Sequence, residues 1–329
     1  MSKILIVGGG SIGKRHLRNI LLLGGYEPGI VEIQSERAVA LREEFKCSVF
    51  TNFPQALTDF FPEIVFVCSP SIYHLDQAKL AVQHGCHIFI EKPLSHNTQG
   101  LKELISLAKE KNIVTMVGSN WKFYPLFKIM KELLDTGAIG RVLSARCQFG
   151  QYLPDWHPWE DYRRGYSANR KLGGGVLLDS HEFDYLTWFL GPVKKIVTFA
   201  GKTSNLEIDV EDVSETILAF VSGAIGEIHL DYVQRFYQRN YEFFGETGTI
   251  TWDVNHKKVL VKRVGDEPQE HLLESDYDFN TMYLEELKHF LLAVQNKLPT
   301  ITPIEKGGGI VTLIEAAKIS AAESRVVEL

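Results

Sequence analysis

A glycine-rich loop near the start of the chain constrains the fold most strongly. The apolar run KILIV is typical of a buried strand, and the glycines of VGGGSIGKRH follow it at once. Gly8, Gly10 and Gly13 have the G-x-G-x-x-G spacing, in which the glycines permit a tight turn, close approach to a pyrophosphate and close helix–strand packing. We therefore expect the loop from Gly8 to Gly13, including Ser11 and Ile12, to bind a dinucleotide at a helix N-terminus.

A carboxylate at the end of the second apolar run indicates which dinucleotide. Glu32 lies 19 residues after Gly13. A carboxylate in this place accepts hydrogen bonds from the ribose hydroxyls and repels a 2′-phosphate. Arg37 could instead reach a phosphate, or it could be a solvated surface arginine. The carboxylate favours NAD as the cofactor, with NADP as the alternative.

The alternation of apolar and polar residues predicts two domains. Up to residue 120, strands at KILIV, GIVEI, IVFVC, HIFI and IVTMV alternate with amphipathic helices, as in a parallel sheet covered on both faces. From about residue 193 to 265, successive strands alternate apolar with polar residues, as in an antiparallel sheet with one covered face. We expect an α/β fold. A Rossmann dinucleotide-binding domain would span 1–120, and an α+β domain with a large open, mainly antiparallel sheet would span 121–329.

Composition excludes several classes of partner. The 329 residues suffice for two domains with their own cores. A formal net charge of −6 gives no general attraction to nucleic acid or to an anionic membrane, and no run approaches the roughly 20 apolar residues of a spanning helix. The cysteines contain no C-x-x-C pair, so neither a disulfide framework nor a zinc knuckle is indicated. We expect a cytoplasmic protein without nucleic-acid or membrane partners.

The strand run HIFI ends in an unusual group of residues, Glu91, Lys92 and Pro93. Charged residues are seldom placed against an apolar strand unless they pair or have a function. Proline stops the strand and fixes the backbone, so the Lys92 side chain would be held in one direction. A structural ion pair and a functional lysine are both open interpretations.

With the glycine loop and Glu91-Lys92-Pro93 in these places, the sequence resembles the Gfo/Idh/MocA family, the relatives of glucose–fructose oxidoreductase and inositol 2-dehydrogenase. The likeness runs over essentially the whole chain. Three stretches are similar to the family's EKP region, its domain-joining segment and its substrate-domain helix: CSPSIYHLDQAKLAVQHGCHIFIEKPLS, VGSNWKFYP and GGGVLLDSHEFDYLTWFLG. The resemblance implies NAD(P)-dependent oxidation or reduction at a secondary hydroxyl or keto carbon of a sugar, sugar acid, nucleotide sugar or cyclitol.

The resemblance also implies catalytic roles. Lys92 matches the motif lysine beside the reacting hydroxyl and the nicotinamide. His181 matches the helix histidine, because His181 and Asp184 keep the H-x-x-D spacing. The family's aspartate four residues before this histidine is replaced by Leu177, whereas Asp179 lies two residues before it. Either Asp179 is catalytic or a different group partners the substrate.

Further binding residues follow from the same resemblance. Besides the glycine loop and Glu32, the residues expected to contact the cofactor are Ser69, Pro70, His74, Glu91 and Lys92. Those expected to contact the substrate are Lys92, Asn120, Lys122, Asp179 and His181.

An aromatic-rich loop supplies candidate anion-binding residues. Tyr162, Arg163 and Arg164 follow two tryptophans, Trp156 and Trp159, that are expected to pack between the domains. Arginine suits a bidentate grip on phosphate or carboxylate, so one residue of this group could hold an anionic part of the substrate.

Two other polar or glycine-rich groups have simpler interpretations. The stretch DSHEFD contains four potential metal ligands, but at helical spacing they fall on different faces, so no metal is expected. The glycine triplet at 307–309 opens a helix without a suitable strand before it. We interpret it as close packing rather than a second phosphate loop.

Other function classes stay open beside a dehydrogenase. The fold could serve a dinucleotide-binding regulator without catalysis, or an NAD-assisted lyase or hydrolase. The presence of both Lys92 and His181 favours the enzyme. Apolar and aromatic residues on several faces of EIHLDYVQ and YEFFG predict a homodimer or homotetramer through the second sheet, as family members commonly form.

Overall fold

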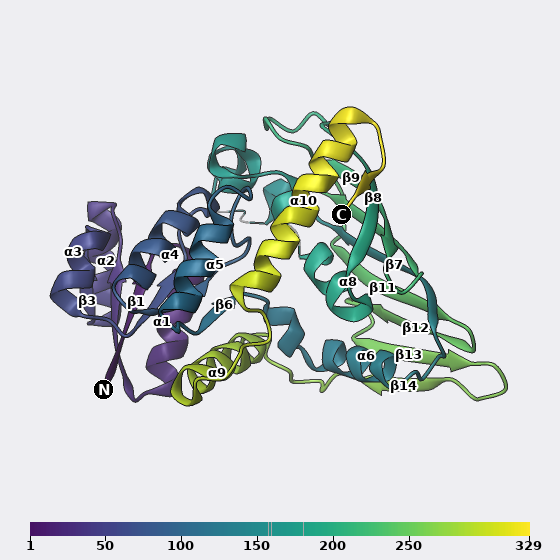
Figure 1. Cartoon of the computed structure of the whole chain (residues 1–329), viewed down its shortest axis with the longest axis horizontal. Coiled ribbons are helices and arrows are strands. Elements are labelled where there is room, and N and C mark those ends of the chain that lie inside the picture. Colours follow the sequence, from purple (N-terminus) through teal and green to yellow (C-terminus); the bar gives the residue numbers. More distant parts are fainter. Residues whose placement is uncertain (157, 159, 180) are drawn as a thin grey trace. The chain divides into compact units, whose positions relative to one another are not determined.

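The alternating strands and helices of the first 120 residues build a six-stranded sheet (Figure 1). Its strands lie in the order β3 (Ser48–Phe50), β2 (Tyr26–Val31), β1 (Ser2–Val7), β4 (Ile64–Val67), β5 (His87–Ile90) and β6 (Thr115–Val117). Every neighbouring pair is parallel. The strand order reverses between β1 and β4, and ligands of such sheets bind outside the carboxyl ends of the strands at this point.

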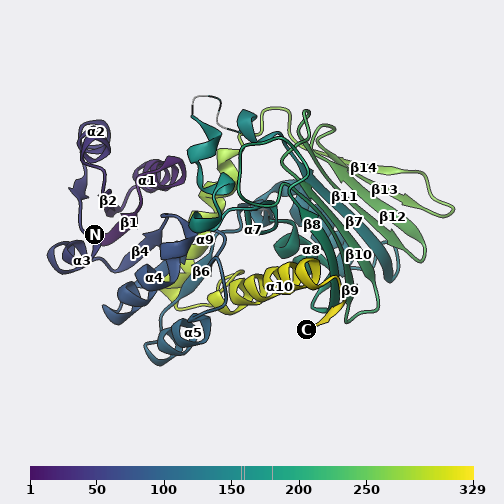
Figure 2. The same ribbon diagram turned by 90° about the horizontal axis from the view of Figure 1, so that it is seen from above.

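Helices cover both faces of this sheet. They are α1 (Ser11–Leu23), α2 (Ser35–Phe45), α3 (Phe53–Phe60), α4 (His74–Gln83) and α5 (Leu101–Glu110). In Figure 2, α1 and α2 lie on one side of the sheet and α4 and α5 on the other. The strands between them are almost wholly apolar and buried, as expected for a sheet covered on both faces.

The computed structural model describes residues 1–156, 158, 160–179 and 181–329, without the side chain of Asp179. It divides into unit 1, residues 1–120 and 279–311, and unit 2, residues 121–278 and 312–329. Residues 279–311, which the sequence pattern places in the second domain, make their contacts with unit 1. This segment contains α9 (Asn280–Asn296) and the start of α10 (Ile304–Glu323).

Long-range contacts explain why the returning segment belongs to unit 1. The ring of Phe290 in α9 packs edge-on against Phe66 and Phe89. The amide of Val117 in β6 donates to the Thr302 carbonyl at 2.7 Å. A Cβ on Gly307 would lie 2.6 Å from a methyl carbon of Val117, so the close packing predicted for the glycine triplet is present at Gly307, whereas a Cβ on Gly309 would meet nothing within 4 Å.

Unit 2 contains a nine-stranded sheet that is antiparallel except for the pair β7 and β10. Its strands, in sheet order, are β14 (Gln269–Leu272), β13 (Lys258–Arg263), β12 (Gly248–Asp253), β11 (Gln238–Gly245), β7 (Val142–Gly150), β10 (Ile225–Asp231), β9 (Val213–Phe220), β8 (Val193–Gly201) and β15 (Val327–Glu328). Unit 2 also contains the helices α6 (Pro125–Asp135), α7 (Val176–Asp179) and α8 (Glu182–Leu190). Figure 2 shows α7 and α8 on one side of the sheet, and α6 packs against β13 and β14.

The other face of the nine-stranded sheet is open among the described residues. Burial alternates along β9 and β10, which places every second side chain on this face. Large apolar side chains are exposed there at Phe199, Ile217 and Ile225. The exposed apolar residues therefore concentrate on β8, β9 and β10, whereas the sequence pointed to β10 and β11.

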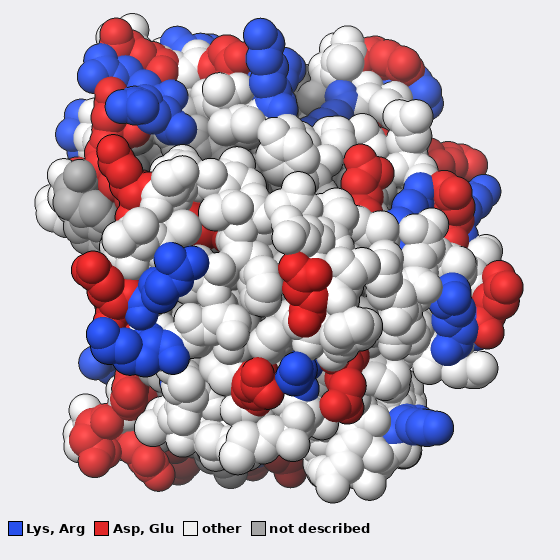
Figure 3. All heavy atoms as spheres, turned by 90° about the vertical axis from the view of Figure 1, so that its left-hand side faces the viewer, with Lys and Arg blue, Asp and Glu red and all other residues white. Residues whose placement is uncertain are grey.

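Charges of both signs are mixed on the surface. On the face of unit 1 drawn in Figure 3, Lys, Arg, Asp and Glu gather toward the sides and are sparse in the middle. This face has no continuous positive field of the kind that attracts nucleic acid. Within the described ranges, no helix combines the length and the apolar character needed to cross a membrane.

Candidate active site

The glycine loop joins β1 to α1 with space for a ligand at one position only. Gly8 has φ +107°, and a Cβ on Gly13 would lie 2.0 Å from the Gly8 carbonyl oxygen, so both must be glycine. A Cβ on Gly10 would meet nothing within 4 Å. Gly10 also caps α1 without a side-chain hydrogen bond, which leaves the first amides of the helix facing this space. The loop therefore fits the pyrophosphate of a dinucleotide.

Glu32 lies directly after β2, beside the glycine loop. Its carboxylate accepts hydrogen bonds from the amides of Gly9 at 3.1 Å and Gln34 at 2.9 Å. The Arg37 guanidinium lies 3.3 Å from the same carboxylate. Arg37, which could have bound a phosphate, is thus paired with Glu32. The buried carboxylate is fixed in the place from which it would contact a ribose.

Glu91 is held by a partner that the sequence analysis missed. The Nε2 atom of His16, on α1, lies 2.6 Å from Glu91 Oε1. The backbone amide of Lys92 donates to Glu91 Oε2 at 3.2 Å. Burial raises the pKa of Glu91, but the hydrogen bond from His16 and the charge of Lys92 outweigh it and hold that pKa below its ordinary value. A histidine on the apolar, buried side of α1, next to Leu17 and Ile20, was the available signal.

The loop around Lys92 is fixed from a second side by His74. Its Nδ1 lies 2.9 Å from the Pro93 carbonyl oxygen and its Nε2 lies 2.7 Å from the Ser69 carbonyl oxygen. Burial lowers the pKa of His74, although these backbone hydrogen bonds oppose the effect. The peptide bond between Lys92 and Pro93 is cis. His74 thus joins the loops after β4 and β5, and both of its ring nitrogens face backbone rather than the cofactor side.

The predicted cofactor residues converge on one edge of the sheet. A Cβ on Gly8 would lie 2.7 Å from the Cys68 carbonyl oxygen, so the glycine loop touches the chain just before Ser69 and Pro70. Glu91 and Lys92 follow the neighbouring strand, β5. The carboxyl ends of β1, β4 and β5 therefore gather the glycine loop, Ser69, Pro70 and Lys92.

In unit 2, His181 lies between two short helices rather than inside the single helix expected from sequence. Its Nδ1 lies 3.1 Å from the Tyr185 hydroxyl oxygen. Its backbone amide donates to Glu182 Oε2 at 3.0 Å. Leu177 is buried and apolar. Ser180 and the side chain of Asp179 lie outside the described residues, so the catalytic role expected of Asp179 stays a prediction.

Lys122 and Asp184 form a buried ion pair within unit 2. The Lys122 ammonium lies 2.6 Å from Asp184 Oδ1, and the lysine side chain is 2 % exposed. The aspartate of the H-x-x-D spacing therefore holds the lysine that was expected to bind substrate. Asn120, the last residue of the first part of unit 1, is buried, and its amide nitrogen lies 3.4 Å from the sulfur of Met282.

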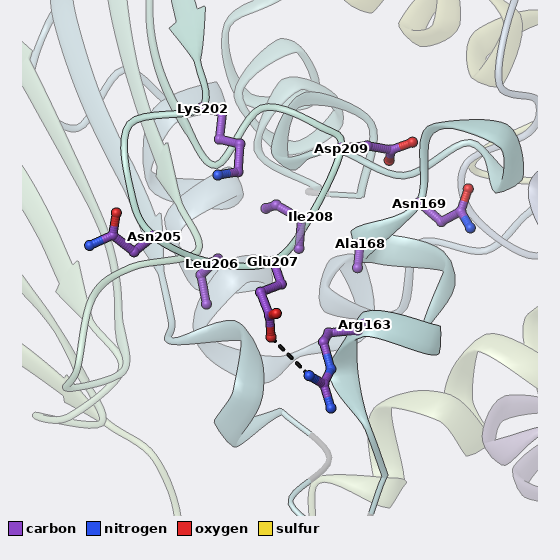
Figure 4. Close-up of a pocket in the computed structure, with 9 residues that line it drawn as sticks. All are labelled: Arg163, Ala168, Asn169, Lys202, Asn205, Leu206, Glu207, Ile208 and Asp209. Carbon is purple, nitrogen blue, oxygen red and sulfur yellow. Dashed lines mark hydrogen bonds and ion pairs between the residues drawn. The ribbon is translucent and has the colours of Figure 1, made fainter.

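The aromatic-rich loop of unit 2 borders a surface depression of about 490 Å³. Figure 4 shows the Arg163 guanidinium turned toward Glu207, at 2.8 Å. The same guanidinium contacts both carboxylate oxygens of Asp161, at 2.8 and 3.0 Å. Two carboxylates thus balance the charge of Arg163. The other two residues predicted to bind an anion are Tyr162 and Arg164. The Tyr162 hydroxyl accepts a hydrogen bond from the Glu207 amide, and Arg164 is exposed.

The tryptophans of the same loop were expected to pack between domains. The Trp156 indole donates to the Gln151 carbonyl at 3.2 Å and packs against Phe149 and Tyr232, all within unit 2. Trp159 lies outside the described residues. Among the described residues, no three His, Cys, Asp or Glu side chains are grouped so that they could hold a metal ion.

Two family models match most of the chain. Residues 2–119 match the model of an oxidoreductase family with an NAD-binding Rossmann fold, and residues 127–251 match the GFO/IDH/MocA C-terminal domain. The chain belongs to the Gfo/Idh/MocA family. Both halves of the resemblance seen in the sequence are therefore confirmed, and unit 1 carries the NAD-binding part of an oxidoreductase.

Named relatives cover nearly the whole chain. Myo-inositol 2-dehydrogenase of Thermotoga maritima is 29% identical over 341 residues, which cover 99% of this chain and 98% of the relative. The scyllo-inositol 2-dehydrogenase (NAD(+)) of Bacillus subtilis is 24% identical over 91% of this chain and 88% of the relative. The solved structure of GenD2 from gentamicin A biosynthesis, in complex with NAD, is 25% identical in sequence and has a TM-score of 0.86. The match covers 100% of this chain and 96% of GenD2.

Proposed function

We propose that this oxidoreductase transfers a hydride between NAD and a secondary CH–OH carbon of a sugar or cyclitol. The observation that carries the proposal is the anchoring of Lys92. The loop that bears it is held by the His16–Glu91 hydrogen bond and by His74, at the same sheet edge as the glycine loop. Two relatives that match the chain over most of their length are named as inositol dehydrogenases, which supports a cyclitol or a related polyol as substrate.

The chain's own groups would handle the hydroxyl and its proton. Bound NAD supplies the hydride acceptor for oxidation of the carbinol carbon. Lys92 holds the hydroxyl by a hydrogen bond and helps to pass its proton, and His181 takes up that proton because an imidazole is suited to proton transfer near neutral pH. In the reverse direction the same groups return the proton to the keto oxygen.

The test compares Lys92→Ala with a matched lysine variant. Lys79→Ala also removes a lysine paired with a carboxylate, Glu103, but on the exposed side of α4. With NAD and a panel of inositols and anhydrosugars, Lys92→Ala should lower kcat by about a hundredfold and leave the NAD dissociation constant within a few-fold. Lys79→Ala should retain wild-type kcat. If Lys92→Ala unfolds the protein while activity per folded molecule survives, Glu91 and Lys92 form only a structural pair.

The same assay separates the other function classes. Turnover with accumulation of reduced nicotinamide supports a dehydrogenase. Turnover without net reduced nicotinamide points to an NAD-assisted lyase or hydrolase. NAD binding without turnover of any compound in the panel points to a regulator.

Three narrower features belong to the proposal. An anionic part of the substrate would bind Arg164 rather than Arg163, because Asp161 and Glu207 already engage Arg163. Self-association would use the open face of the nine-stranded sheet, where Phe199 is 72% exposed. The cytoplasm is the proposed location, since all four cysteines, Cys47, Cys68, Cys86 and Cys147, are free thiols.

A further inference from the structure

The imidazole of His181, which directly precedes α8, has a hydrogen-bonding partner in that helix. Tyr185 lies one turn further along α8, and its hydroxyl oxygen is 3.1 Å from His181 Nδ1. The two rings are nearly parallel, with an interplanar angle of 4°. Tyr185 is fully buried, and its ring packs edge-on against Phe127 at 5.5 Å. The hydroxyl is therefore held in one place.

The backbone of His181 is anchored as well. Its amide donates to Glu182 Oε2, while Glu182 Oε1 accepts from Arg239 at 2.6 and 2.7 Å. Both members of this pair are buried, and the Arg239 guanidinium lies 4.5 Å from the ring centroid of Trp121. A buried ion pair packed on aromatic rings fixes the start of α8 and the position of the histidine.

The described carboxylates nearest in sequence are engaged elsewhere. Glu182 is balanced by Arg239, and Asp184 lies against Lys122. Other titratable groups face the Glu182–Arg239 pair as well: Tyr241 places its hydroxyl 3.5 Å from Glu182, and Tyr237 and Cys147 lie near both charges. The Arg239 guanidinium also lies 5.6 Å from the ring centroid of Tyr185. The family's aspartate position is occupied by Leu177. Among the described residues, the Tyr185 hydroxyl lies within hydrogen-bond distance of His181 Nδ1.

We propose that Tyr185 is a positioning residue that selects Nε2 as the working nitrogen of His181. The Nδ1 hydrogen is donated to the Tyr185 oxygen, so the lone pair for the substrate proton stays on Nε2. In histidines generally, the hydrogen bond made by one ring nitrogen decides whether the other ring nitrogen carries a hydrogen. After proton uptake the same Nδ1 hydrogen still donates to Tyr185, which stabilises the imidazolium. The inference rests on the proposed role of His181 as the base.

The test removes only the hydroxyl, as Tyr185→Phe in the full-length protein. Tyr124→Phe is the matched control, because Tyr124 is also fully buried in unit 2 and its ring also contacts Phe127. In Tyr185→Phe, kcat should fall about tenfold, consistent with one lost hydrogen bond, while KM for NAD stays within twofold. The acidic limb of the plot of kcat against pH should move to lower pH. The imidazolium of His181 loses the oxygen that accepts its Nδ1 hydrogen, so its protonated form is less stable. Tyr124→Phe should change neither kcat nor the limb.

A spectroscopic measurement gives a second readout. In ¹⁵N-histidine NMR, assigned with His181→Gln, the neutral ring of the wild type should carry its hydrogen on Nδ1, and Tyr185→Phe should shift it toward Nε2. An unchanged tautomer and unchanged pH profile in Tyr185→Phe would overturn the proposal. So would a shift of the limb in Asp179→Asn but not in Tyr185→Phe. If His181→Ala itself keeps full activity, the proposed function fails instead, which separates the two ideas.

Discussion

The Nε2 atom of His16 lies 2.6 Å from Glu91 Oε1, and this hydrogen bond joins the helix of the glycine loop to the residue before Lys92. A carboxylate only accepts, so the histidine donates through Nε2. Gly118 leaves room for the other oxygen, since a Cβ there would lie 3.1 Å from Glu91 Oε2. The helix of the cofactor loop and the backbone of the proposed catalytic lysine are therefore joined through the carboxylate of Glu91.

His16→Leu should destabilise the protein in a pH-dependent way. The pKa of Glu91 is now lowered, so its contribution to stability is present above its ordinary value of 4.5 and is lost as pH falls through the lower folded value. Without His16, burial would raise that pKa. The variant should then lose about 2–3 kcal/mol of unfolding free energy near pH 7 and less near pH 5, where Glu91 takes up a proton. Urea unfolding at both pH values measures this, and Glu91→Leu in the same background should restore part of the loss. An equal loss of unfolding free energy at the two pH values would contradict this role of the hydrogen bond between His16 and Glu91.

Two glycines of the loop should separate folding from cofactor binding. Gly13→Ala places a Cβ 2.0 Å from a backbone oxygen, so it should lower the unfolding free energy by about 1–3 kcal/mol. Gly10→Ala meets no protein atom within 4 Å and has φ −70°, so stability should stay within about 0.5 kcal/mol. Its NAD affinity should nevertheless fall about tenfold or more, because the new methyl group occupies the pyrophosphate approach. Titration with NADH fluorescence tests this, and undiminished affinity in Gly10→Ala would show that the pyrophosphate lies elsewhere.

The enzyme should prefer NAD over NADP. Glu32 is buried beside the loop and paired with Arg37, so a 2′-phosphate would meet a carboxylate. We expect kcat/KM to favour NAD by about tenfold or more. Glu32→Ala should lower the ratio of kcat/KM with NAD to kcat/KM with NADP, because Arg37 is released and can contact the 2′-phosphate. Adding Arg37→Ala should abolish this improvement with NADP. A wild-type preference for NADP would mean that Arg37 dominates over the carboxylate.

The open face of the nine-stranded sheet should hold the oligomer together. Phe199→Glu places a charge in the exposed apolar group of β8, β9 and β10 and should yield monomers by light scattering at micromolar concentration. Phe236→Glu is the control, because Phe236 is 86% exposed but follows β10 in a loop. That variant should keep the wild-type mass. A monomeric wild type would end the proposal.

The periodic parts of the fold could be predicted from sequence, and the aperiodic parts could not. The apolar runs of β1, β4 and β5 are buried on both faces, so their composition alone identifies them. The three residues of β3 are too few to show a period. β14, with the sequence QEHL, is a polar and mostly exposed edge strand. Such segments pair because their neighbours bring them together, which local sequence does not encode.

The site shows the same division. The glycine loop and Glu32 are recognisable because their spacing follows from the geometry of a strand, a turn and a helix. His16 and Tyr185 could not be predicted from sequence, because each contacts a candidate site residue, Glu91 and His181, only in the folded chain. Glu91 is 75 residues from His16 in the chain. Tyr185 lies one turn from His181, but helical spacing does not show that its hydroxyl faces the imidazole.

The return of the chain to unit 1 governs how this protein can be cut and recombined. The Thr300 hydroxyl donates to the Thr115 carbonyl at 2.6 Å, and the Ile304 amide donates to the Thr115 hydroxyl at 3.2 Å, so residues 300–304 run along the edge strand β6. A fragment ending at residue 120 would bare that edge and the ring faces that Phe290 covers, and exposed edges invite aggregation. Chimaeras that exchange substrate specificity with a relative must therefore keep the native residues 279–311 with α9, and must exchange residues 312–329 together with 121–278, because β15 pairs with β8. Each half of the protein is thus assembled from two separate pieces of the chain, and neither can be transplanted as one continuous segment.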